Sequence, residues 1–203
     1  MQRDSPLSEL TITTFESKRL SFVPTVAEHA QVTYPLLADE KLYVWMPGNP
    51  LDLPSLQERY AFWESRRSPD GKEWWWNWVI NLKGTERTDG PPTCVGTLQV
   101  GIDKASHVAT LAYIIGSQYQ RNGYATEALN ALLNLLRLKG VHQAMAWVDT
   151  RNIPSIGLLQ KLKFTSIDRI EKADYFKGSQ SDELVFSLLL EHSDPSAMFE
   201  AYG

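Results

Sequence analysis

The segment "QRNGYATEAL" (120–129) stands where a strand-like run gives way to a strongly helical one. The first turn of a helix has backbone N–H groups without intrahelical acceptors, and it carries partial positive charge. Gly123 lets an anion approach the backbone closely, and the small side chains of Ala125 and Thr126 leave the first turn open. These residue types predict a site for a phosphate or pyrophosphate group at the start of the helix.

Two familiar phosphate-binding motifs do not match this segment. A Walker loop ends in Gly-Lys-Ser/Thr, whereas Tyr124 and Ala125 follow Gly123 in place of that lysine and that serine or threonine. A dinucleotide fingerprint needs three glycines, whereas residues 120–129 contain one. A second interpretation stays open at this point, in which Gly123 only permits a tight turn.

Other kinds of catalytic chemistry have little support in the sequence. The four histidines are far apart and lack HExxH spacing, and no Cys-x-x-Cys pair is present, so we expect no metal site. No Gly-x-Ser-x-Gly elbow is present for a hydrolase triad. The single cysteine, Cys94, lies in a strand-like run without an obvious basic neighbour, so we do not expect a covalent enzyme intermediate.

The composition is that of an ordinary globular protein of one domain. The 203 residues are 43% hydrophobic and 22% charged, and a formal charge of −4 leaves no basic surplus to neutralise nucleic-acid phosphates. One cysteine allows no internal disulfide, which fits a reducing compartment. The sequence has neither a signal-peptide pattern nor a long apolar run. We therefore expect a cytoplasmic protein that binds neither nucleic acid nor a membrane.

The elements around the segment indicate the fold class. Apolar residues recur at helical spacing over 125–136, and Gly140 is the expected stop. The run 74–82 is strand-like and rich in tryptophan, and 93–102 and 107–115 follow it as adjacent antiparallel strands. The sequence predicts a single α/β domain with a mixed, mainly antiparallel sheet flanked by helices. Further strands are expected at 19–26, 141–149, 164–170 and 183–190, and further helices at 26–37, 55–66 (capped by Ser55) and 154–162.

Two motifs in these elements resemble the GCN5-related N-acetyltransferase (GNAT) superfamily, in particular its RimJ/RimL-like branch of ribosomal-protein N-terminal acetyltransferases. Residues 120–125 match the family pattern Gln/Arg-x-x-Gly-x-Gly/Ala at a strand-helix junction. The second pattern, Asn-x-x-Ser before a Leu-Leu helix and a closing Phe, is met by Asn152, Ser155, Leu158, Leu159 and Phe164. The element order extends the match to a domain over 17–192, with 1–16 as an N-terminal extension and 193–203 as a C-terminal tail.

The resemblance implies that acetyl-CoA is the co-substrate. The N–H groups of the loop are expected to hold its pyrophosphate, and the end of the preceding strand to pair with the pantetheine arm by main-chain hydrogen bonds. A backbone N–H of that strand is expected to polarise the acetyl carbonyl, and Asn152 to orient the cofactor near the thioester. The implied cofactor-binding residues are Ile114, Ile115, Gly116, Gln120, Arg121, Asn122, Gly123, Tyr124, Ala125, Thr126 and Asn152.

The sequence departs from the family pattern at the acid and base positions. Thr110 stands where many members have a glutamate, and Leu159 stands where others have a tyrosine. Ser155 is the remaining candidate donor to the departing thiolate, and with Asn152 it forms the predicted catalytic pair. The alternative for Ser155 is a helix cap. Glu127 as a base competes with a simpler interpretation, in which it complements the helix dipole.

The aromatic strand also has two interpretations. On a strand, Trp74, Trp76 and Trp78 share one face and Trp75 lies on the other. They either fill the core or form an aromatic wall of the acceptor pocket, joined there by other aromatic residues such as Trp45 and Tyr43.

We therefore predict an N-acetyltransferase that moves an acetyl group directly from acetyl-CoA to a primary amine. The acceptor is a protein N-terminus or a small molecule. Loss of a dedicated base favours a weakly basic amine, because an α-amine has a pKa near 7.7 to 8 and a lysine side chain near 10.4. The alternative is a non-catalytic acyl-CoA-binding or interaction module of the same fold. The expected assembly is a monomer or a homodimer.

Overall fold

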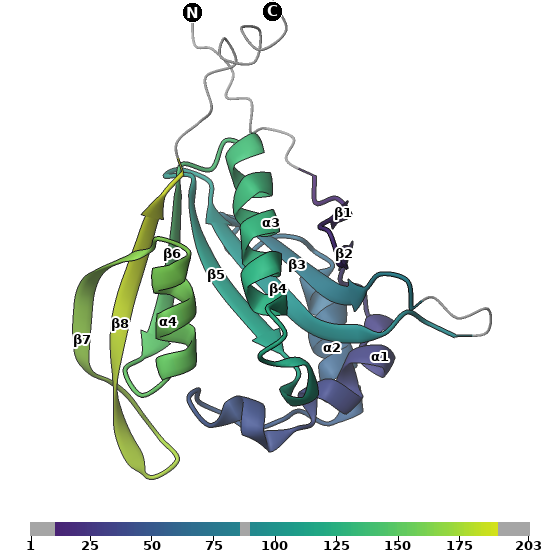
Figure 1. The fold of residues 1–203 in the computed structure, drawn as a ribbon, viewed down its shortest axis with the longest axis horizontal. Coiled ribbons are helices and arrows are strands. Elements are labelled where there is room, and N and C mark those ends of the chain that lie inside the picture. Colours follow the sequence, from purple (N-terminus) through teal and green to yellow (C-terminus); the bar gives the residue numbers. More distant parts are fainter. Residues whose placement is uncertain (1–10, 86–89, 191–203) are drawn as a thin grey trace, which may run out of the picture.

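The computed structural model describes residues 11–85 and 90–190. They form an eight-stranded sheet in the order β1-β2-β3-β4-β5-β6-β8-β7, flanked by four α-helices (Figure 1). The predicted α/β class and the mainly antiparallel sheet are confirmed. The strands are β1 (Phe15–Glu16), β2 (Leu20–Pro24), β3 (Glu73–Leu82), β4 (Cys94–Asp103), β5 (Val108–Ile115), β6 (Gln143–Asp149), β7 (Thr165–Phe176) and β8 (Ser179–Leu189). The α-helices are α1 (His29–Leu37), α2 (Leu53–Trp63), α3 (Tyr124–Leu138) and α4 (Ile153–Lys161), and two 3-10 turns are η1 (Glu40–Tyr43) and η2 (Ser117–Tyr119).

The helices cover the sheet on both faces. Helices α3 and α4 lie on one face, and α1 and α2 lie on the other (Figure 1). The larger apolar core lies under α3, where the side chains of Trp76 and Trp78 are completely or almost completely buried. The core interpretation of these two tryptophans is therefore confirmed. Trp75 points to the opposite face and makes an edge contact with Phe62, which lies on α2.

Strands β5 and β6 are the one parallel pair among the described strands, and they separate early. Val108, Ala109 and Thr110 pair with residues 143–145, and no pairing between the two strands follows. A parallel pair needs a crossover, and here α3 provides it. Because β5 runs on to Ile115 without β6 beside it, the sheet opens between these strands at their C-terminal ends.

Two local features differ from the sequence-based expectation. Helix α2 begins at Leu53, and its cap is Asp52, whose Oδ1 accepts a hydrogen bond from the backbone N–H of Ser55 at 2.9 Å. Ser55 as the cap was therefore wrong, because an aspartate three residues earlier takes that role. Phe15 and Glu16, placed in the predicted extension, pair with β2.

The C-terminal hairpin is also longer than the two predicted strands. Strands β7 and β8 pair over most of their length and meet at a turn around Gly178. Residues 1–10 of the predicted extension and the whole predicted tail, 193–203, lie outside the described residues. No helix in the described ranges is long and apolar enough to cross a membrane.

Candidate active site

The loop between β5 and α3 turns sharply at Gly123. This residue has φ 78° and ψ 3° and is the N-cap of α3. A side chain is unfavourable at this left-handed φ, so the turn itself is one reason for glycine here. A Cβ atom on Gly123 would lie 3.5 Å from Nη2 of Arg19, so the space above the residue is not filled by the protein core.

The backbone N–H groups of residues 121–126 donate no hydrogen bond within the described part of the chain. The first N–H with an acceptor is that of Glu127, which donates to the carbonyl of Gly123 at 3.0 Å. Side chains hold the loop in shape: Gln120 Nε2 donates to the carbonyl of Ile115 at 3.1 Å, and Asn122 Nδ2 donates to that of Tyr119 at 3.2 Å. The loop therefore presents a run of free donors at the positive end of a 15-residue helix.

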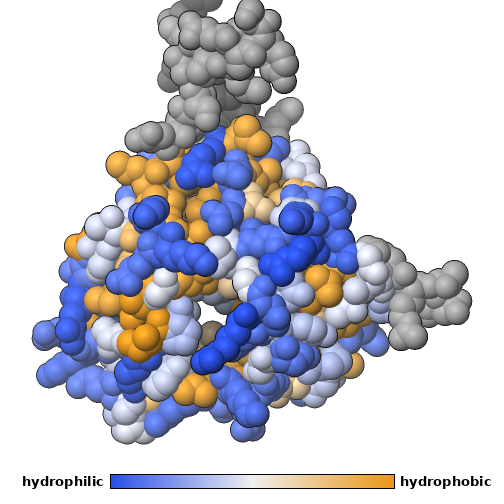
Figure 2. Space-filling view, in the orientation of Figure 1, coloured by the Kyte–Doolittle hydropathy of each residue, from blue (hydrophilic) through white to orange (hydrophobic). Residues whose placement is uncertain are grey.

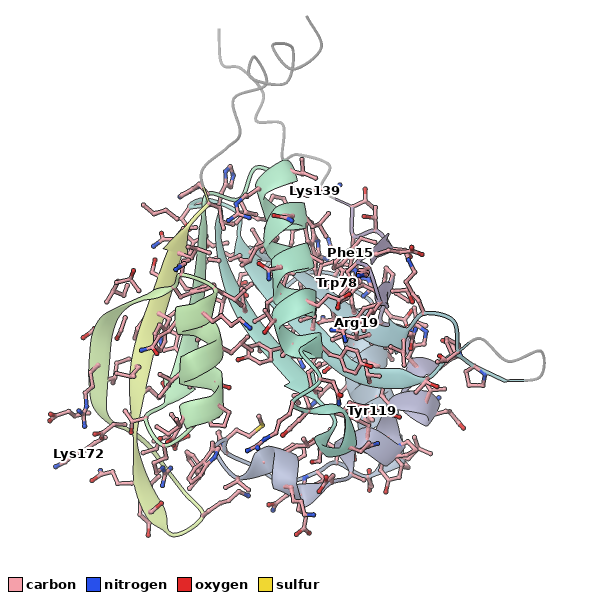
Figure 3. The ribbon with its side chains drawn as sticks, viewed as in Figure 1. Phe15, Arg19, Trp78, Tyr119, Lys139 and Lys172 are labelled. Carbon is pink, nitrogen blue, oxygen red and sulfur yellow. The ribbon has the colours of Figure 1, made fainter. Side chains whose placement is uncertain are left out.

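Glu127 anchors the start of α3 to the turn between β1 and β2. Its Oε1 accepts hydrogen bonds from the Ser17 hydroxyl at 2.7 Å and the Arg19 N–H at 2.6 Å, and its Oε2 lies 2.6 Å from Nε of Arg19. Burial raises the pKa of Glu127, but these partners together hold that pKa below its ordinary value. Arg19 also lies over the ring of Tyr124, next to the first turns of α3 (Figure 3). Both oxygens of the Glu127 carboxylate are thus engaged by Ser17 and Arg19 at the first turn of α3.

The predicted pantetheine-binding residues lie on a free strand edge. On one side β5 pairs with β4 along its length, as far as Gly96 opposite Ile115. On the other side, past Thr110, it has no strand partner in the described part of the chain. The side chain of Ile115 is buried in the larger core, and that of Ile114 packs against α1 and α2. The side chains are thus anchored while the main chain stays open to an extended ligand.

The N-terminus of α4 borders the same opening. Asn152 caps the helix, because its Oδ1 accepts a hydrogen bond from the backbone N–H of Ser155 at 3.2 Å. The Ser155 hydroxyl makes no hydrogen bond to a described backbone group, so the cap alternative for Ser155 is not what the structure shows. The space-filling view shows the surface hollowed between α4, the loop before α3 and the segment around η1 (Figure 2).

Tyr113 of β5 points its hydroxyl toward Ser155. This hydroxyl is buried and has no hydrogen-bond partner in the described part of the chain. Burial raises the pKa of Tyr113, and the neighbouring Ser155 hydroxyl lowers that pKa to a smaller extent. A buried hydroxyl without a partner is costly, so a polar ligand group at this place would satisfy it. Our sequence analysis missed Tyr113, although its place in the alternating pattern of 107–115 put its side chain on the same face as Leu111.

An ion pair at the end of β6 fixes the position of α4. Asp149 is almost completely buried and binds Arg151 through both carboxylate oxygens, and it accepts a further hydrogen bond from the Ser181 hydroxyl at 2.6 Å. The pKa of Asp149 is lowered to about 2, mainly because Arg151 donates hydrogen bonds to the carboxylate. The Arg151 guanidinium lies over the rings of Trp45 and Phe176, at 5.2 and 5.3 Å. Trp45, expected in an acceptor wall, therefore contacts this ion pair.

Two cavities lie near the opening. One, of about 760 Å³, lies between the η1 segment and Lys177 at the tip of the β7–β8 hairpin, and Tyr43 lines it. The other, of about 320 Å³, lies on the sheet face opposite α3 and α4. Trp75 lines it, so one of the four tryptophans in the predicted wall faces a cavity. Its lining consists of Trp63, Glu73, Trp75, Asn77, Gln99, Val100, Gly101, Thr110, Leu111 and Ala112.

Cys94 is not poised for nucleophilic chemistry. Burial raises the pKa of its thiol to about 11, so the thiolate is scarce at neutral pH. Within residues 11–85 and 90–190, no group of three His, Cys, Asp or Glu side chains is placed to hold a metal ion.

The structure thus brings the predicted cofactor residues and the predicted pair Asn152 and Ser155 to one opening between β5 and β6. The N-terminal ends of α3 and α4 flank it (Figure 1). Sequence reasoning missed Tyr113 and also Glu73, which lines the smaller cavity. The signal for Glu73 was its place two residues before Trp75 on the same strand face.

The fold is shared with several solved acetyltransferases. The ribosomal-protein-S5-alanine acetyltransferase of Vibrio fischeri has a TM-score of 0.73 and 19% identity, covering 90% of this chain and 100% of its own. The spermidine N-acetyltransferase of Vibrio cholerae, in complex with CoA and spermine, has a TM-score of 0.71 and 16% identity, covering 86% and 97%. The microcin C7 self-immunity acetyltransferase, in complex with acetyl-CoA and AMP, has a TM-score of 0.68 and 20% identity, covering 85% and 93%.

The TM-scores show a common fold, and the names of the first two structures give different acceptors, a ribosomal-protein alanine and spermidine. None of the curated proteins matches the chain as a relative. The family model for the acetyltransferase (GNAT) domain matches residues 19–165, which is most of the chain and includes the loop, the free edge of β5 and the start of α4. The chain therefore belongs to the GNAT acetyltransferase family.

Proposed function

We propose that the protein transfers an acetyl group from acetyl-CoA to a primary amine, with the coenzyme lying in the opening between β5 and β6. The observation that carries this proposal is the run of free N–H groups at 121–126, directly after an unpaired strand edge. The family assignment confirms the predicted class, an acetyl-CoA-dependent acetyltransferase. The acceptor and the roles of individual residues are proposals.

The residues of the opening fit the three parts of coenzyme A. The free donors of the loop would bind the pyrophosphate, where the helix dipole favours negative charge. The edge of β5 at Ile114, Ile115 and Gly116 would pair with the amide groups of the pantetheine arm. The Oδ1 atom of Asn152 is engaged in the helix cap, and the NH₂ group of the same side chain would orient the arm near the thioester.

Two hydroxyl groups are placed to serve the leaving thiolate. Acetyl-CoA supplies a thioester that an amine attacks directly. Ser155 and Tyr113 lie beside each other where the arm would end, and the buried Tyr113 hydroxyl has no other partner in the described residues. These hydroxyls would donate a hydrogen bond or a proton to the sulfur as the C–S bond breaks. A backbone N–H on the free edge of β5 would polarise the acetyl carbonyl.

The experiment is a thiol-release assay with purified protein, acetyl-CoA and a panel of amines that includes free peptide N-termini, lysine side chains and polyamines. Calorimetry with coenzyme A measures binding separately. We expect heat on binding and thiol release with at least one primary amine. Binding without release across the panel would favour the alternative, a non-catalytic acyl-CoA-binding module. No binding would contradict the reading of residues 121–126.

A further inference from the structure

We propose that the 320 Å³ cavity on the opposite sheet face is the acceptor site, and that Glu73 binds the incoming ammonium group and takes its proton. The cavity accepts an amine that carries a single positive charge and a neighbouring amide group. This inference rests on the proposed function and adds the acceptor site, its base and its substrate class.

The cavity meets the place where the acetyl group would lie. Thr110, Leu111 and Ala112 line it, and these residues are the first of β5 at and beyond the end of its pairing with β6. A pantetheine arm that pairs with the free edge at Ile114 and Ile115 would therefore bring its acetyl end toward this stretch. Donor and acceptor would then meet at the edge of β5 from the two faces of the sheet.

The Glu73 carboxylate occupies the space that a side chain on β4 would otherwise fill. Gly101 has no side chain, and a Cβ atom placed on it would lie 3.3 Å from Oε2 of Glu73. Gly101 pairs with Thr110 on β5, so the carboxylate lies next to that residue's position on the same face. Glu73 thus brings a carboxylate to the neighbourhood of Thr110, although no acidic residue stands on that part of β5.

A neighbouring tryptophan orients this carboxylate. The indole N–H of Trp75 donates a hydrogen bond to Oε2 of Glu73 at 2.8 Å. The other oxygen, Oε1, accepts no hydrogen bond from a described residue and is available to a ligand. Trp75 and Trp63 line the cavity beside the carboxylate, and aromatic rings next to a carboxylate favour a cationic group.

The remaining polar groups indicate the kind of amine. Asn77 and Gln99 face each other across β3 and β4, and neither makes a side-chain hydrogen bond to another described residue. Asn77 is only 5% exposed, so its side chain is almost buried at the place where it lines the cavity. Amide side chains donate and accept, as a peptide-like amide requires. Among the described lining residues Glu73 is the one charged group, which favours a single cation over a polyamine.

The proton balance is complete with these groups. The ammonium gives one proton to the Glu73 carboxylate and becomes a neutral amine with a lone pair. Its nitrogen then forms the C–N bond to the acetyl carbon as the C–S bond breaks. The nitrogen gives its second proton to water. The thiolate takes a proton from the hydroxyl pair of Ser155 and Tyr113, which regains one from water, and it leaves as coenzyme A, so one proton is released overall. Glu73 releases its proton to water.

The test compares the wild type with Glu73→Gln, and uses Glu58→Gln, on the exposed face of α2, as the matched control. The probes are alaninamide, which carries an α-amine beside an amide, spermidine, and hydroxylamine, which is uncharged at neutral pH. We expect Glu73→Gln to lower the rate with alaninamide on the order of 100-fold. The rate with hydroxylamine and the affinity for coenzyme A should stay near the wild-type values. Spermidine should be a poorer substrate than alaninamide for the wild type.

A second pair of variants keeps the test decisive. Thr110→Glu in the Glu73→Gln protein places a carboxylate in the same cavity and should restore part of the rate with alaninamide. Gly101→Leu fills the cavity at a position without left-handed φ, and it should raise the KM for alaninamide without changing coenzyme A binding. If Glu73→Gln does not fold, the KM of the Gly101→Leu protein for alaninamide decides whether the cavity is the acceptor site.

The outcomes separate this inference from the function on which it rests. A wild type that binds no coenzyme A, or releases no thiol with any amine, contradicts the proposed function. A wild type that acetylates alaninamide, together with Glu73→Gln and Gly101→Leu proteins that do so equally well, overturns the acceptor site alone. Preference for spermidine over alaninamide overturns the substrate class.

Discussion

Arg151 forms a bidentate ion pair with Asp149, with Nε 2.9 Å from Oδ1 and Nη2 2.6 Å from Oδ2. Asp149 ends β6 and Arg151 directly precedes the cap of α4, so this pair sets where the helix begins. The Arg151 guanidinium also lies over the ring of Trp45, which follows η1, and over that of Phe176 at the end of β7. One ion pair therefore connects three parts of the chain around the opening.

This pair predicts how stability depends on pH. The folded-state pKa of Asp149 is about 2, below the ordinary 3.8, so the carboxylate stabilises the fold above about pH 4. The contribution, about 2 kcal/mol, is lost as the pH falls from about 4 to about 2. We expect Asp149→Asn to lower the free energy of unfolding in urea at pH 6 by at least this amount, and by much less near pH 2. The exposed Asp168→Asn is the control, and equal effects of the two variants at pH 6 would contradict the prediction.

Removing the Tyr113 hydroxyl should lower turnover and leave stability intact. Tyr113→Phe deletes a buried group that has no hydrogen-bond partner in the described residues, so the free energy of unfolding should stay the same or rise. If the hydroxyl serves the thiolate, kcat should fall on the order of tenfold or more with little change in the KM for acetyl-CoA. Steady-state kinetics and urea denaturation of the same preparation check both halves. Unchanged kcat removes Tyr113 from the mechanism.

Ser155→Ala tests the partner hydroxyl. Because Asn152 and not Ser155 caps α4, we expect the substitution to cost little stability. Its effect on kcat should be non-additive with that of Tyr113→Phe, since the two hydroxyls lie together. A double-mutant cycle on kcat gives the coupling. Additive effects would mean that the two groups act separately.

Gly123 has both a turn role and a proposed binding role, and two substitutions separate them. Its φ of 78° is tolerated by asparagine better than by valine, so Gly123→Asn should fold with a smaller loss of stability than Gly123→Val, which should cost about 1 kcal/mol or more. If the loop cradles the pyrophosphate, Gly123→Val should lose its preference for coenzyme A over pantetheine, which lacks the pyrophosphate. Calorimetry with both ligands measures this preference. Equal weakening of both ligands would leave Gly123 with the turn role alone.

Glu127 should matter for stability and not for catalysis. Its carboxylate accepts hydrogen bonds from Ser17 and Arg19, so Glu127→Gln should lower the free energy of unfolding by about 1 to 3 kcal/mol. Activity per folded molecule should remain near the wild-type value, because both carboxylate oxygens are engaged by Ser17 and Arg19 in the turn between β1 and β2. Thermal unfolding and thiol release on the same sample check this. A large loss of kcat with unchanged stability would revive Glu127 as a base.

Local patterns explain which elements could be predicted. The apolar spacing over 125–136 identifies α3 because a helix must turn one face to the core, and the observed helix, Tyr124–Leu138, contains that span. The N-cap of α2 was predicted at Ser55 and lies at Asp52. Both are good capping residues, and the sequence does not show which one precedes the first helical turn.

The separation of β5 from β6 could not be read from either strand. It depends on where the crossover through α3 brings β6 beside β5. The apolar pattern of residues 107–115 is the same whether that strand pairs on one edge or on both. Glu73 was missed for a related reason. Its role depends on an absent side chain at Gly101, almost thirty residues later in the chain, and only the strand register brings the two together.

The early parting of β5 and β6 has a kinetic consequence. A coenzyme held at the ends of α3 and α4 and an amine held in the cavity on the other face enter by separate routes, so neither must leave before the other arrives. Both substrates are then present together when the acetyl group moves. Initial rates measured over a grid of donor and acceptor concentrations should give double-reciprocal lines that intersect, whereas parallel lines would signal an acetylated enzyme.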